Sequence, residues 1–242
     1  MELKDSVFIV TGAAGGIGQA VTRHLIDAGA RVGAIDRVPA SFGDRSLFVE
    51  CDVRDPAEVA SAVSEIARWG GRLDGVVNNA AILRDGALVR LTRAGIEKLD
   101  LESWNDTLQT NLTGTLLVAR EAVPRMIESK ARGVIVNLSS VSRKGNAGQS
   151  AYAATKAAVD ALTRTWAEEL AFFKIRVVAV APGLIDTPMA RSIPKDRLDR
   201  YQRRTPAGRI GAPDEIAKMV LAIATNDYVN ATTIEVDGGF TF

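Results

Sequence analysis

The sequence is poor in the residues from which many protein sites are built. Its 242 residues include one cysteine, Cys51, and one histidine, His24. A lone cysteine cannot form an intramolecular disulfide, which is typical of proteins from reducing compartments. A single histidine excludes zinc sites made of several Cys and His ligands, and His24 lies in a helix-like run that does not suit a Ser-His-Asp triad. We interpret His24 as a helix-surface residue and Cys51 as a small core residue.

Long apolar runs and an excess of one charge are also missing. The net charge is +1, which gives the molecule no bias toward nucleic acid or a membrane surface. No apolar stretch approaches the ~18 residues of a membrane span, and the first ten residues lack the apolar core of a secretory signal. We therefore expect a cytoplasmic protein that binds neither nucleic acid nor membrane.

Short apolar, β-rich segments alternate with helix-length segments along the chain. Strands are predicted at 7–10, 31–35, 47–50, 75–77, 133–138, 175–180 and 233–236, and helices after the Gly-rich turn and at 56–69, 104–128, 151–173 and 214–224. This alternation favours an α/β fold with a doubly wound parallel sheet and helices on both faces. No linker or repeat divides the chain, so residues 1–242 are predicted to form a single Rossmann-type domain.

A glycine-rich turn follows the first predicted strand and opens the first helix. It carries four glycines where the backbone turns sharply, and its candidate site residues are Gly12, Gly15, Gly16, Ile17 and Gly18. Glycine lets the backbone approach a pyrophosphate, and the N–H groups at the helix start hold the negative charge. The spacing differs from G-x-G-x-x-G, so a tight β–α connection remains the alternative, but the position between strand and helix favours a nucleotide site.

The second strand ends in Asp36, followed by Arg37. A carboxylate at this place can accept hydrogen bonds from the adenosine ribose hydroxyls of NAD, and it would repel the 2′-phosphate of NADP. Arg37 could pair with that phosphate if Asp36 swung away. The pattern favours NAD as the cofactor, with a plain turn role for Asp36 as the alternative.

Tyr152 and Lys156 are spaced i,i+4 at the start of a predicted helix, which places both side chains on one face. A nearby ammonium favours the phenolate form of a tyrosine and lowers its pKa. Tyr152 could then take a proton from an alcohol while hydride leaves the carbon, and return it in the reverse direction. An isolated Tyr–Lys pair is often a surface contact, so this interpretation needs support from elsewhere in the chain.

Three further polar positions give that support. Ser139 and Ser140 close an apolar strand, at the end where open α/β sheets bind ligands, and a serine there can hold a substrate oxygen. Asn111 stands inside a predicted helix, where an amide is disfavoured unless it has a task. Asn79 and Ala80 follow another apolar strand.

In this order, these motifs and Pro182-Gly183 resemble the short-chain dehydrogenases/reductases from residue 7 to residue 239. The resemblance implies a sheet of about seven strands and a homotetramer. It also implies a catalytic set of Asn111, Ser140, Tyr152 and Lys156, in which Tyr152 is the acid/base, Lys156 binds the nicotinamide ribose, Ser140 orients the substrate and Asn111 holds a relay water. It implies cofactor contacts from Asp52, Val53, Asn79, Ala80, Pro182, Gly183, Ile185 and Thr187.

The family's usual Ser-to-Tyr spacing is matched by Ser139, whereas Ser140 lies one residue closer to Tyr152. We favour Ser140, because alternation fixes the facing of residues within a strand while loop lengths drift. The segment 83–102 is also longer than in typical members.

Residues 189–209 follow the Pro-Gly pair, where the family carries its substrate lid. They include seven basic residues and two acidic ones: Arg191, Lys195, Arg197, Arg200, Arg203, Arg204 and Arg209 against Asp196 and Asp199. A solvated helix face is one interpretation, and recognition of an anionic or thioester-linked substrate is the other.

The loop 145–149 is similar to that of 3-oxoacyl-thioester reductases, which usually prefer NADP. Asp36 argues against this cofactor, so we expect an NAD enzyme that oxidises a secondary alcohol, a hydroxy acid or a hydroxyacyl compound. The alternatives are an NADP-type 3-oxoacyl reductase and, from another class, a nucleotide-sensing protein without turnover.

Overall fold

The computed structural model describes residues 1–84, 86–130, 132–191, 193 and 195–240, except for the side chains of residues 196 and 197. Its centre is a seven-stranded sheet in which every neighbouring pair is parallel. The strands lie in the order β3 (Ser46–Glu50), β2 (Arg31–Asp36), β1 (Val7–Thr11), β4 (Gly75–Asn78), β7 (Val134–Leu138), β8 (Arg176–Pro182) and β9 (Thr232–Val236). The order reverses between β1 and β4, the kind of switch point at which α/β sheets bind ligands.

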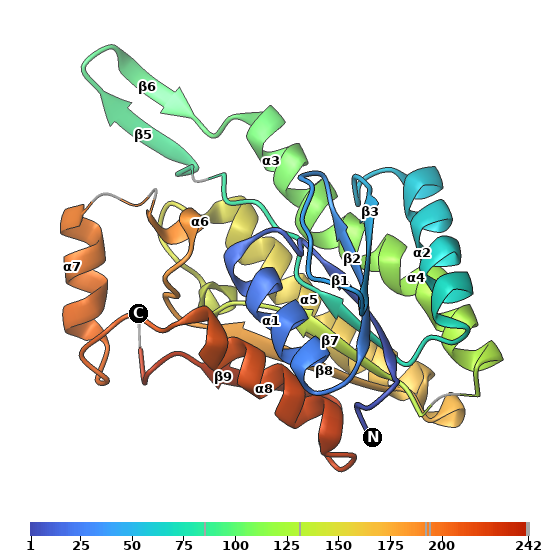
Figure 1. Ribbon diagram of the computed structural model, residues 1–242. Coiled ribbons are helices and arrows are strands. Elements are labelled where there is room, and N and C mark those ends of the chain that lie inside the picture. Colours follow the sequence, from blue (N-terminus) through green and yellow to red (C-terminus); the bar gives the residue numbers. More distant parts are fainter. Residues whose placement is uncertain (85, 131, 192, 194, 241–242) are drawn as a thin grey trace.

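Helices cover both faces of the sheet (Figure 1). On one face lie α1 (Gly16–Asp27) and α8 (Pro213–Thr225), and on the other lie α2 (Pro56–Gly70), α4 (Gly114–Glu128) and α5 (Ser150–Glu169). Alternation along β1 serves both cores, because Phe8 and Val10 belong to the apolar cluster of the first face while Val7 and Ile9 belong to that of the second. The predicted doubly wound fold is confirmed.

The long helix predicted at 104–128 is corrected by the structure. The helical stretch begins three residues earlier, at α3 (Leu101–Leu108), and passes through a π-helical turn, η1 (Gln109–Thr113), before α4. The helix predicted at 151–173 ends as α5 at Glu169, and a short 3-10 turn, η3 (Ala171–Phe173), follows it. In the basic segment, for which a solvated helix face was one interpretation, the structure has two helices, α6 (Pro188–Arg191) and α7 (Lys195–Arg204).

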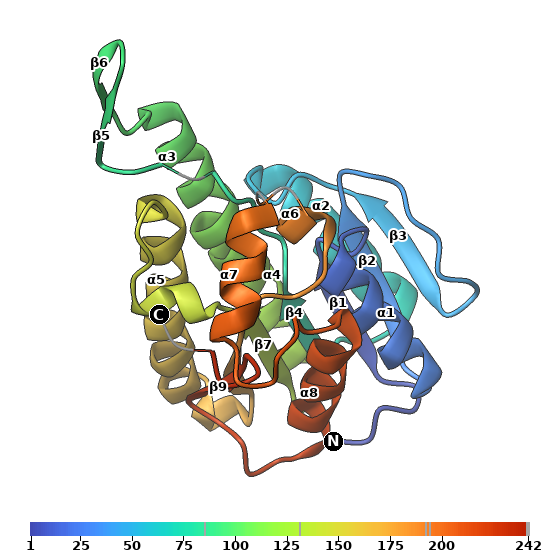
Figure 2. The same cartoon turned by 90° about the vertical axis from the view of Figure 1, so that its left-hand side faces the viewer.

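A β-hairpin that the sequence analysis missed projects from the body beside α3 (Figures 1 and 2). Its strands are β5 (Val89–Thr92) and β6 (Gly95–Lys98), and they pair antiparallel with Leu91 opposite Ile96. Both of these side chains are largely exposed, at 81% and 71%. The alternation of apolar Val89 and Leu91 with polar residues in β5 is the signal that could have predicted the hairpin.

The base of the hairpin contacts the loop before α5. The Gly86 N–H donates to the Gly148 carbonyl at 2.8 Å, and Gly86 forms an isolated parallel bridge with Gln149. The hairpin therefore joins the body of the protein next to the predicted catalytic helix.

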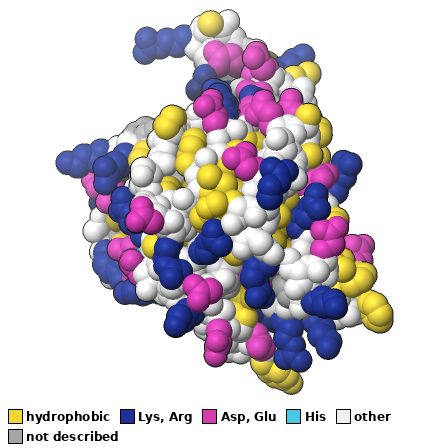
Figure 3. Space-filling view, turned by 45° about the vertical axis from the view of Figure 1, so that its right-hand side comes forward, with side chains coloured by type: hydrophobic (Ala, Val, Ile, Leu, Met, Phe, Trp, Pro, Cys, Tyr) yellow, Lys and Arg dark blue, Asp and Glu magenta, His cyan; other side chains and the backbone are white. Residues whose placement is uncertain are grey.

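The surface is of mixed charge on the face that Figure 3 displays, where lysine and arginine side chains are interspersed with aspartate and glutamate. Within the described part of the chain, no helix combines the length and apolarity needed to cross a lipid bilayer.

The exposure of the hairpin predicts that its tip contributes little to the stability of the fold. Val89 and Lys98 are register partners, so residues 90–97 can be replaced by Asn-Gly, which forms a tight two-residue turn. We expect the free energy of unfolding in urea to change by less than about 1 kcal/mol. Phe8→Ala, in the fully buried core, is the contrasting variant and should cost about 3–5 kcal/mol. Comparable losses in both variants would contradict this prediction.

Candidate active site

The glycine-rich turn between β1 and α1 is held in place by hydrogen bonds to residues at the end of β4. The Asn79 amide donates to the carbonyls of Thr11 (2.9 Å) and Gly12 (3.0 Å), and the Thr11 hydroxyl accepts from the N–H groups of Asn79 and Ala80. Gly12 has a φ of +64°, and a Cβ there would lie 2.9 Å from the Ala80 Cα. The turn thus requires glycine and is held rigid, as an anion cradle should be.

A cleft of about 630 Å³ runs along the carboxyl ends of the strands. It is lined by the predicted site residues Gly12, Gly15, Gly16, Ile17, Asp36, Arg37, Asp52, Val53, Asn79, Ala80, Ser140, Tyr152, Lys156, Pro182, Gly183, Ile185 and Thr187. Two predicted residues, Gly18 and Asn111, are not among the lining residues. A Cβ on Gly18 would lie 2.1 Å from the Gly12 carbonyl oxygen, so this glycine serves the packing of the turn instead.

Asp36 at the end of β2 is fixed by backbone donors. Its Oδ2 accepts from the Ala14 N–H at 2.9 Å, and its Oδ1 accepts from the N–H groups of Arg37 and Val38 at 2.7 and 3.1 Å. The carboxylate therefore links the second strand to the glycine-rich turn. Swinging it away would leave three N–H groups without their acceptor.

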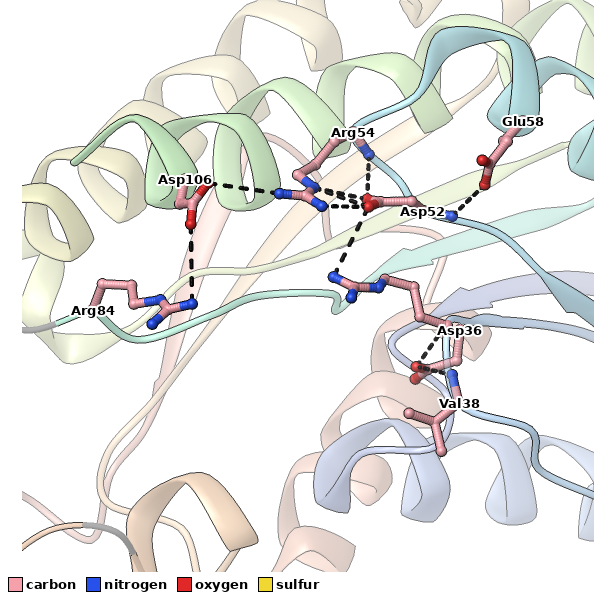
Figure 4. A network of polar contacts seen from close by, with 8 residues as sticks. Asp36, Val38, Asp52, Arg54, Glu58, Arg84 and Asp106 are labelled. Carbon is pink, nitrogen blue, oxygen red and sulfur yellow. Dashed lines mark hydrogen bonds and ion pairs between the residues drawn. The ribbon is translucent and has the colours of Figure 1, made fainter. Parts of the chain in front are cut away.

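An ionic network continues from Asp36 along the rim of the cleft (Figure 4). Arg54 donates from Nε and Nη2 to both oxygens of Asp52, and these hydrogen bonds lower the pKa of that carboxyl. Arg37 lies 3.9 Å from Asp52, and Asp106 on α3 pairs with Arg54 at 3.6 Å and with Arg84 at 3.9 Å. Sequence analysis missed Arg54, Arg84 and Asp106, because only the fold brings them to one rim.

Tyr152 and Lys156 lie together on α5, as their spacing predicted. The Lys156 Nζ is 5.6 Å from the centre of the Tyr152 ring and donates to the Leu138 carbonyl at 2.6 Å. The lysine side chain is 3% exposed. This burial lowers the pKa of Lys156 to about 8, against an opposing effect of the Asp160 charge.

The two candidate serines at the end of β7 differ in their contacts. The Ser139 hydroxyl donates to the Lys156 carbonyl at 3.2 Å, so its hydrogen is committed to the backbone of α5. The Ser140 oxygen accepts from the Ser142 N–H at 3.1 Å and caps the short 3-10 helix η2 (Val141–Lys144). No acceptor among the described residues takes the Ser140 hydroxyl hydrogen, which leaves it available to a bound oxygen.

Asn111 lies in the π-turn and is fully buried. Its Oδ1 accepts from the Ile82 N–H at 2.8 Å, and its Nδ2 donates to the Ile82 carbonyl at 2.9 Å. Its Nδ2 also lies 3.5 Å from the Thr155 hydroxyl, which donates to the Tyr152 carbonyl. The π-turn, a feature often found at functional sites, thus joins the segment after β4 to the helix that carries Tyr152.

The basic residues of 189–209 are not brought to the cleft as a group. The lining from this segment is Met189, Ala190, Ile193 and Tyr201, with Phe240 beside them. Arg203 and Arg204 are exposed, and Arg191 and Arg209 pair with Asp186 and Glu215. The side chain of Arg197 lies outside the described residues. Tyr201 was missed, although an aromatic residue in a helix of basic side chains is a readable signal of a buried face.

Two other single residues fit their interpretation from the sequence. Cys51 is buried, and this burial raises the pKa of its thiol to about 12, so the group is not a reactive thiolate at neutral pH. His24 lies on α1 and pairs with the exposed Asp214 at 3.1 Å.

Together, the switch-point cleft, the glycine-rich helix start and the Tyr–Lys pair define a dinucleotide-binding α/β protein with acid/base groups in the same cleft. A family model described as enoyl-(acyl carrier protein) reductase matches residues 12–241. The 3-oxoacyl-[acyl-carrier-protein] reductase of Thermotoga maritima is 39% identical over 99% of both chains. The cis-4-hydroxycyclohexanecarboxylate dehydrogenase of Sinomonas cyclohexanicum is 37% identical over 98% of this chain and 97% of its own.

A solved structure gives the same result for the fold. The aldohexose dehydrogenase of Thermoplasma acidophilum, in its ligand-free form, superposes with a TM-score of 0.88 at 32% identity, covering 98% of this chain and 94% of its own. The chain belongs to the short-chain dehydrogenase/reductase family, whose members are oxidoreductases that use a nicotinamide cofactor and act on CH–OH groups. The resemblance stated from the sequence motifs is confirmed.

The paired contacts of Asn111 predict a structural cost that a surface asparagine does not carry. Asn111→Leu leaves the Ile82 N–H and carbonyl without partners, and we expect unfolding in urea to become easier by about 2 kcal/mol. Asn105→Leu, on the exposed side of α3, is the matched control and should stay within about 0.5 kcal/mol of the parent. Equal stability of the two variants would refute the anchoring role.

Proposed function

We propose that residues 1–242 form one catalytic domain that transfers hydride between NAD and a secondary alcohol or its ketone. The observation that carries this proposal is the cleft itself, since the glycine-rich turn and the Tyr152–Lys156 pair line the same cavity. When bound, the nicotinamide supplies the hydride acceptor for oxidation and the hydride donor for reduction. The backbone cradle at Gly12 and the helix start at Gly16 fit a pyrophosphate, because neither position tolerates a Cβ in this packing.

Tyr152 acts as the acid/base at the substrate oxygen. It takes the hydroxyl proton during oxidation and returns it during reduction. The Lys156 ammonium, 5.6 Å from the ring centre, stabilises the phenolate that forms, and this attraction is strong because the lysine is buried away from water. Lys156 is held in place by the Leu138 carbonyl and also binds the nicotinamide ribose.

Ser140 orients the substrate by donating its hydroxyl hydrogen to the reacting oxygen. Asn111 holds the relay water that carries the proton onward. Its amide is engaged by Ile82, which leaves the main-chain carbonyl for this task. That carbonyl accepts from the Thr115 hydroxyl at 2.9 Å, and a carbonyl oxygen has two lone pairs with which it can accept.

The cofactor preference rests on Asp36. Its carboxylate is locked by three backbone N–H groups and stands where the adenosine ribose hydroxyls bind, so a 2′-phosphate would meet a fixed negative charge. Asp52, Val53, Asn79 and Ala80 line the adenosine end, and Pro182, Gly183, Ile185 and Thr187 line the other end of the cofactor site. The alternative is an NADP-type 3-oxoacyl reductase, supported by the named relatives and by the exposed guanidinium of Arg37.

The substrate end of the cleft combines two kinds of lining. Ser142, Asn146 and Gln149 supply polar groups, while Met189, Ile193, Tyr201 and Phe240 supply apolar surface. This combination suits a hydroxyl or ketone carbon flanked by a polar group and followed by an apolar portion. A hydroxyacyl thioester or a hydroxy acid has both features. We propose a cytoplasmic homotetramer, without a nucleic-acid or membrane partner.

The proposed chemistry predicts that Tyr152→Phe removes turnover while leaving the fold and cofactor site intact. We expect kcat to fall about 10²- to 10⁴-fold, because the acid/base group is lost, with NAD affinity by calorimetry little changed. Tyr228→Phe, at a fully exposed tyrosine, is the control and should behave as the parent. The assay is initial rates over a panel of secondary alcohols, hydroxy acids and hydroxyacyl thioesters. Tight NAD binding by the parent protein with no turnover on this panel would favour the nucleotide-sensing alternative.

The cofactor assignment predicts the effect of Asp36→Asn. This change removes the charge but keeps one acceptor oxygen for the turn, so the NAD-to-NADP ratio of kcat/KM should fall by roughly tenfold, equal to about 1.4 kcal/mol. Arg37→Gln in the same background should reverse part of the gain for NADP. A parent enzyme that prefers NADP would refute the assignment outright.

A further inference from the structure

Behind the proposed catalytic lysine lies a buried ionic cluster that the proposed mechanism does not use. Asp160 follows Lys156 by one turn on the same face of α5. Its Oδ2 is paired with the Nε of Arg143 on η2, and the Arg143 Nη2 donates to Glu235 on β9 at 2.7 Å. The Arg143 side chain is 14% exposed and that of Asp160 is 21% exposed, so this pair is largely removed from water.

The cluster joins the three elements around the site. Ser140 caps η2, which carries Arg143, and α5 carries Tyr152 and Lys156. The Asp160–Arg143 pair therefore ties the segment of the serine to the helix of the tyrosine and the lysine. Glu235 fixes the guanidinium to β9 and receives Lys144 on the same oxygen.

The pair has few other ways to satisfy its charges. The Arg143 Nη1 and the Asp160 Oδ1 are buried and have no hydrogen-bond partner among the described residues. Asp160 thus depends on Arg143, and removing Arg143 leaves the Asp160 carboxylate without its counter-charge, whereas Arg143 also has Glu235 as a partner.

Lys156 needs a negative charge nearby, because burial disfavours its ammonium form. The elements that pack against α5 carry these charged side chains: Arg143 and Lys144 on η2, Arg176 on β8, Glu102 and Asp106 on α3, and Glu235 on β9, while β7, η1 and η3 carry none. On α5 itself, Tyr152, Arg164, Glu168 and Glu169 accompany Lys156 and Asp160. Within the described part, Asp160 is the carboxylate whose charge counters the effect of burial on the pKa of Lys156.

We propose that Asp160, fixed by Arg143, is a positioning residue that keeps the buried Lys156 ammonium charged during turnover. The proposal rests on the function proposed above for Tyr152 and Lys156. Asp160 touches neither substrate nor cofactor, and it acts through Lys156. Arg143 in turn holds the Asp160 carboxylate in place through its Nε.

The test is the pH profile of kcat for Asp160→Asn, which removes the charge at nearly constant shape. If the pKa of Lys156 falls by about one unit, its charged fraction drops about twofold at pH 7 and about ninefold at pH 9, and the profiles converge near pH 6. The alkaline limb of the kcat profile should therefore move to lower pH. Asp160→Glu keeps the charge and should restore most of the limb. Asp214→Asn, in the exposed pair with His24, is the distant control and should leave the profile unchanged.

Arg143→Gln gives a second, independent variant in case Asp160→Asn does not fold. Without the guanidinium, the Asp160 carboxylate is no longer held at the Arg143 Nε and can turn toward solvent, away from Lys156, so the alkaline limb should move in the same direction, and Arg143→Lys should restore it. The double variant with Asp160→Asn should show no further movement, because both changes remove one interaction. A limb that superimposes on that of the parent, or an equal loss of kcat at every pH, would overturn the proposal.

A direct titration separates this inference from the proposed function. The full-length protein with ¹⁵N-labelled lysine, assigned with Lys156→Arg, reports the protonation of Lys156 by NMR without any turnover. A midpoint that moves to lower pH in Asp160→Asn supports the role of Asp160 even if the parent protein oxidises no alcohol. An unchanged midpoint overturns it even if the parent is fully active.

Discussion

The structure depends most on a charge buried where an apolar core would be expected. Lys156 places its ammonium against the Leu138 carbonyl at the end of β7, almost out of contact with water. An ammonium at such a depth is costly unless it is hydrogen-bonded and offset by a negative charge. The Leu138 carbonyl accepts the hydrogen bond, and Asp160 is the carboxylate that we propose as the negative charge. The position of α5 over the sheet is thereby set by an electrostatic requirement as well as by apolar packing.

The sheet meets this requirement by bringing its carboxyl ends to one edge. Parallel pairing places the ends of β1, β2, β4, β7 and β8 side by side, so residues far apart in the sequence converge without long loops. Three of these strand ends contribute a polar side chain that contacts a neighbouring element. Asn79 braces the turn after β1, Asp36 holds that turn from β2, and the serines after β7 meet α5. The parallel strands therefore fill the two apolar cores along their length and place polar side chains of the cleft at their carboxyl ends.

Most of the fold and much of the cleft could be predicted from the sequence, because both follow from local patterns. Apolar runs defined the strands of the main sheet, and glycine spacing and the i,i+4 Tyr–Lys pair defined two parts of the site. What could not be predicted depends on distances across the fold. The salt bridges from Arg54 and Arg84 to Asp106 join three separate segments, and Asp160 acquires its partner from η2. The roles of individual residues in turnover stay predictions.

The π-turn at 109–113 lies between α3, next to the projecting hairpin, and α4, which packs on the main sheet. A π-turn holds one residue more than an α-helical turn, so it resets the rotational phase of the helix by about 100°. Because Asn111 is tied to Ile82 on one side and reaches α5 on the other, the phase of α4 is set by that anchor and not by what precedes it. The segment between Arg84 and Asp100 lies before α3 and outside these contacts, so a change in its length leaves the Asn111 anchor in place. The projecting hairpin occupies this segment as a two-stranded sheet of its own, so it can be lengthened or shortened without disturbing the strand pairing of the main sheet.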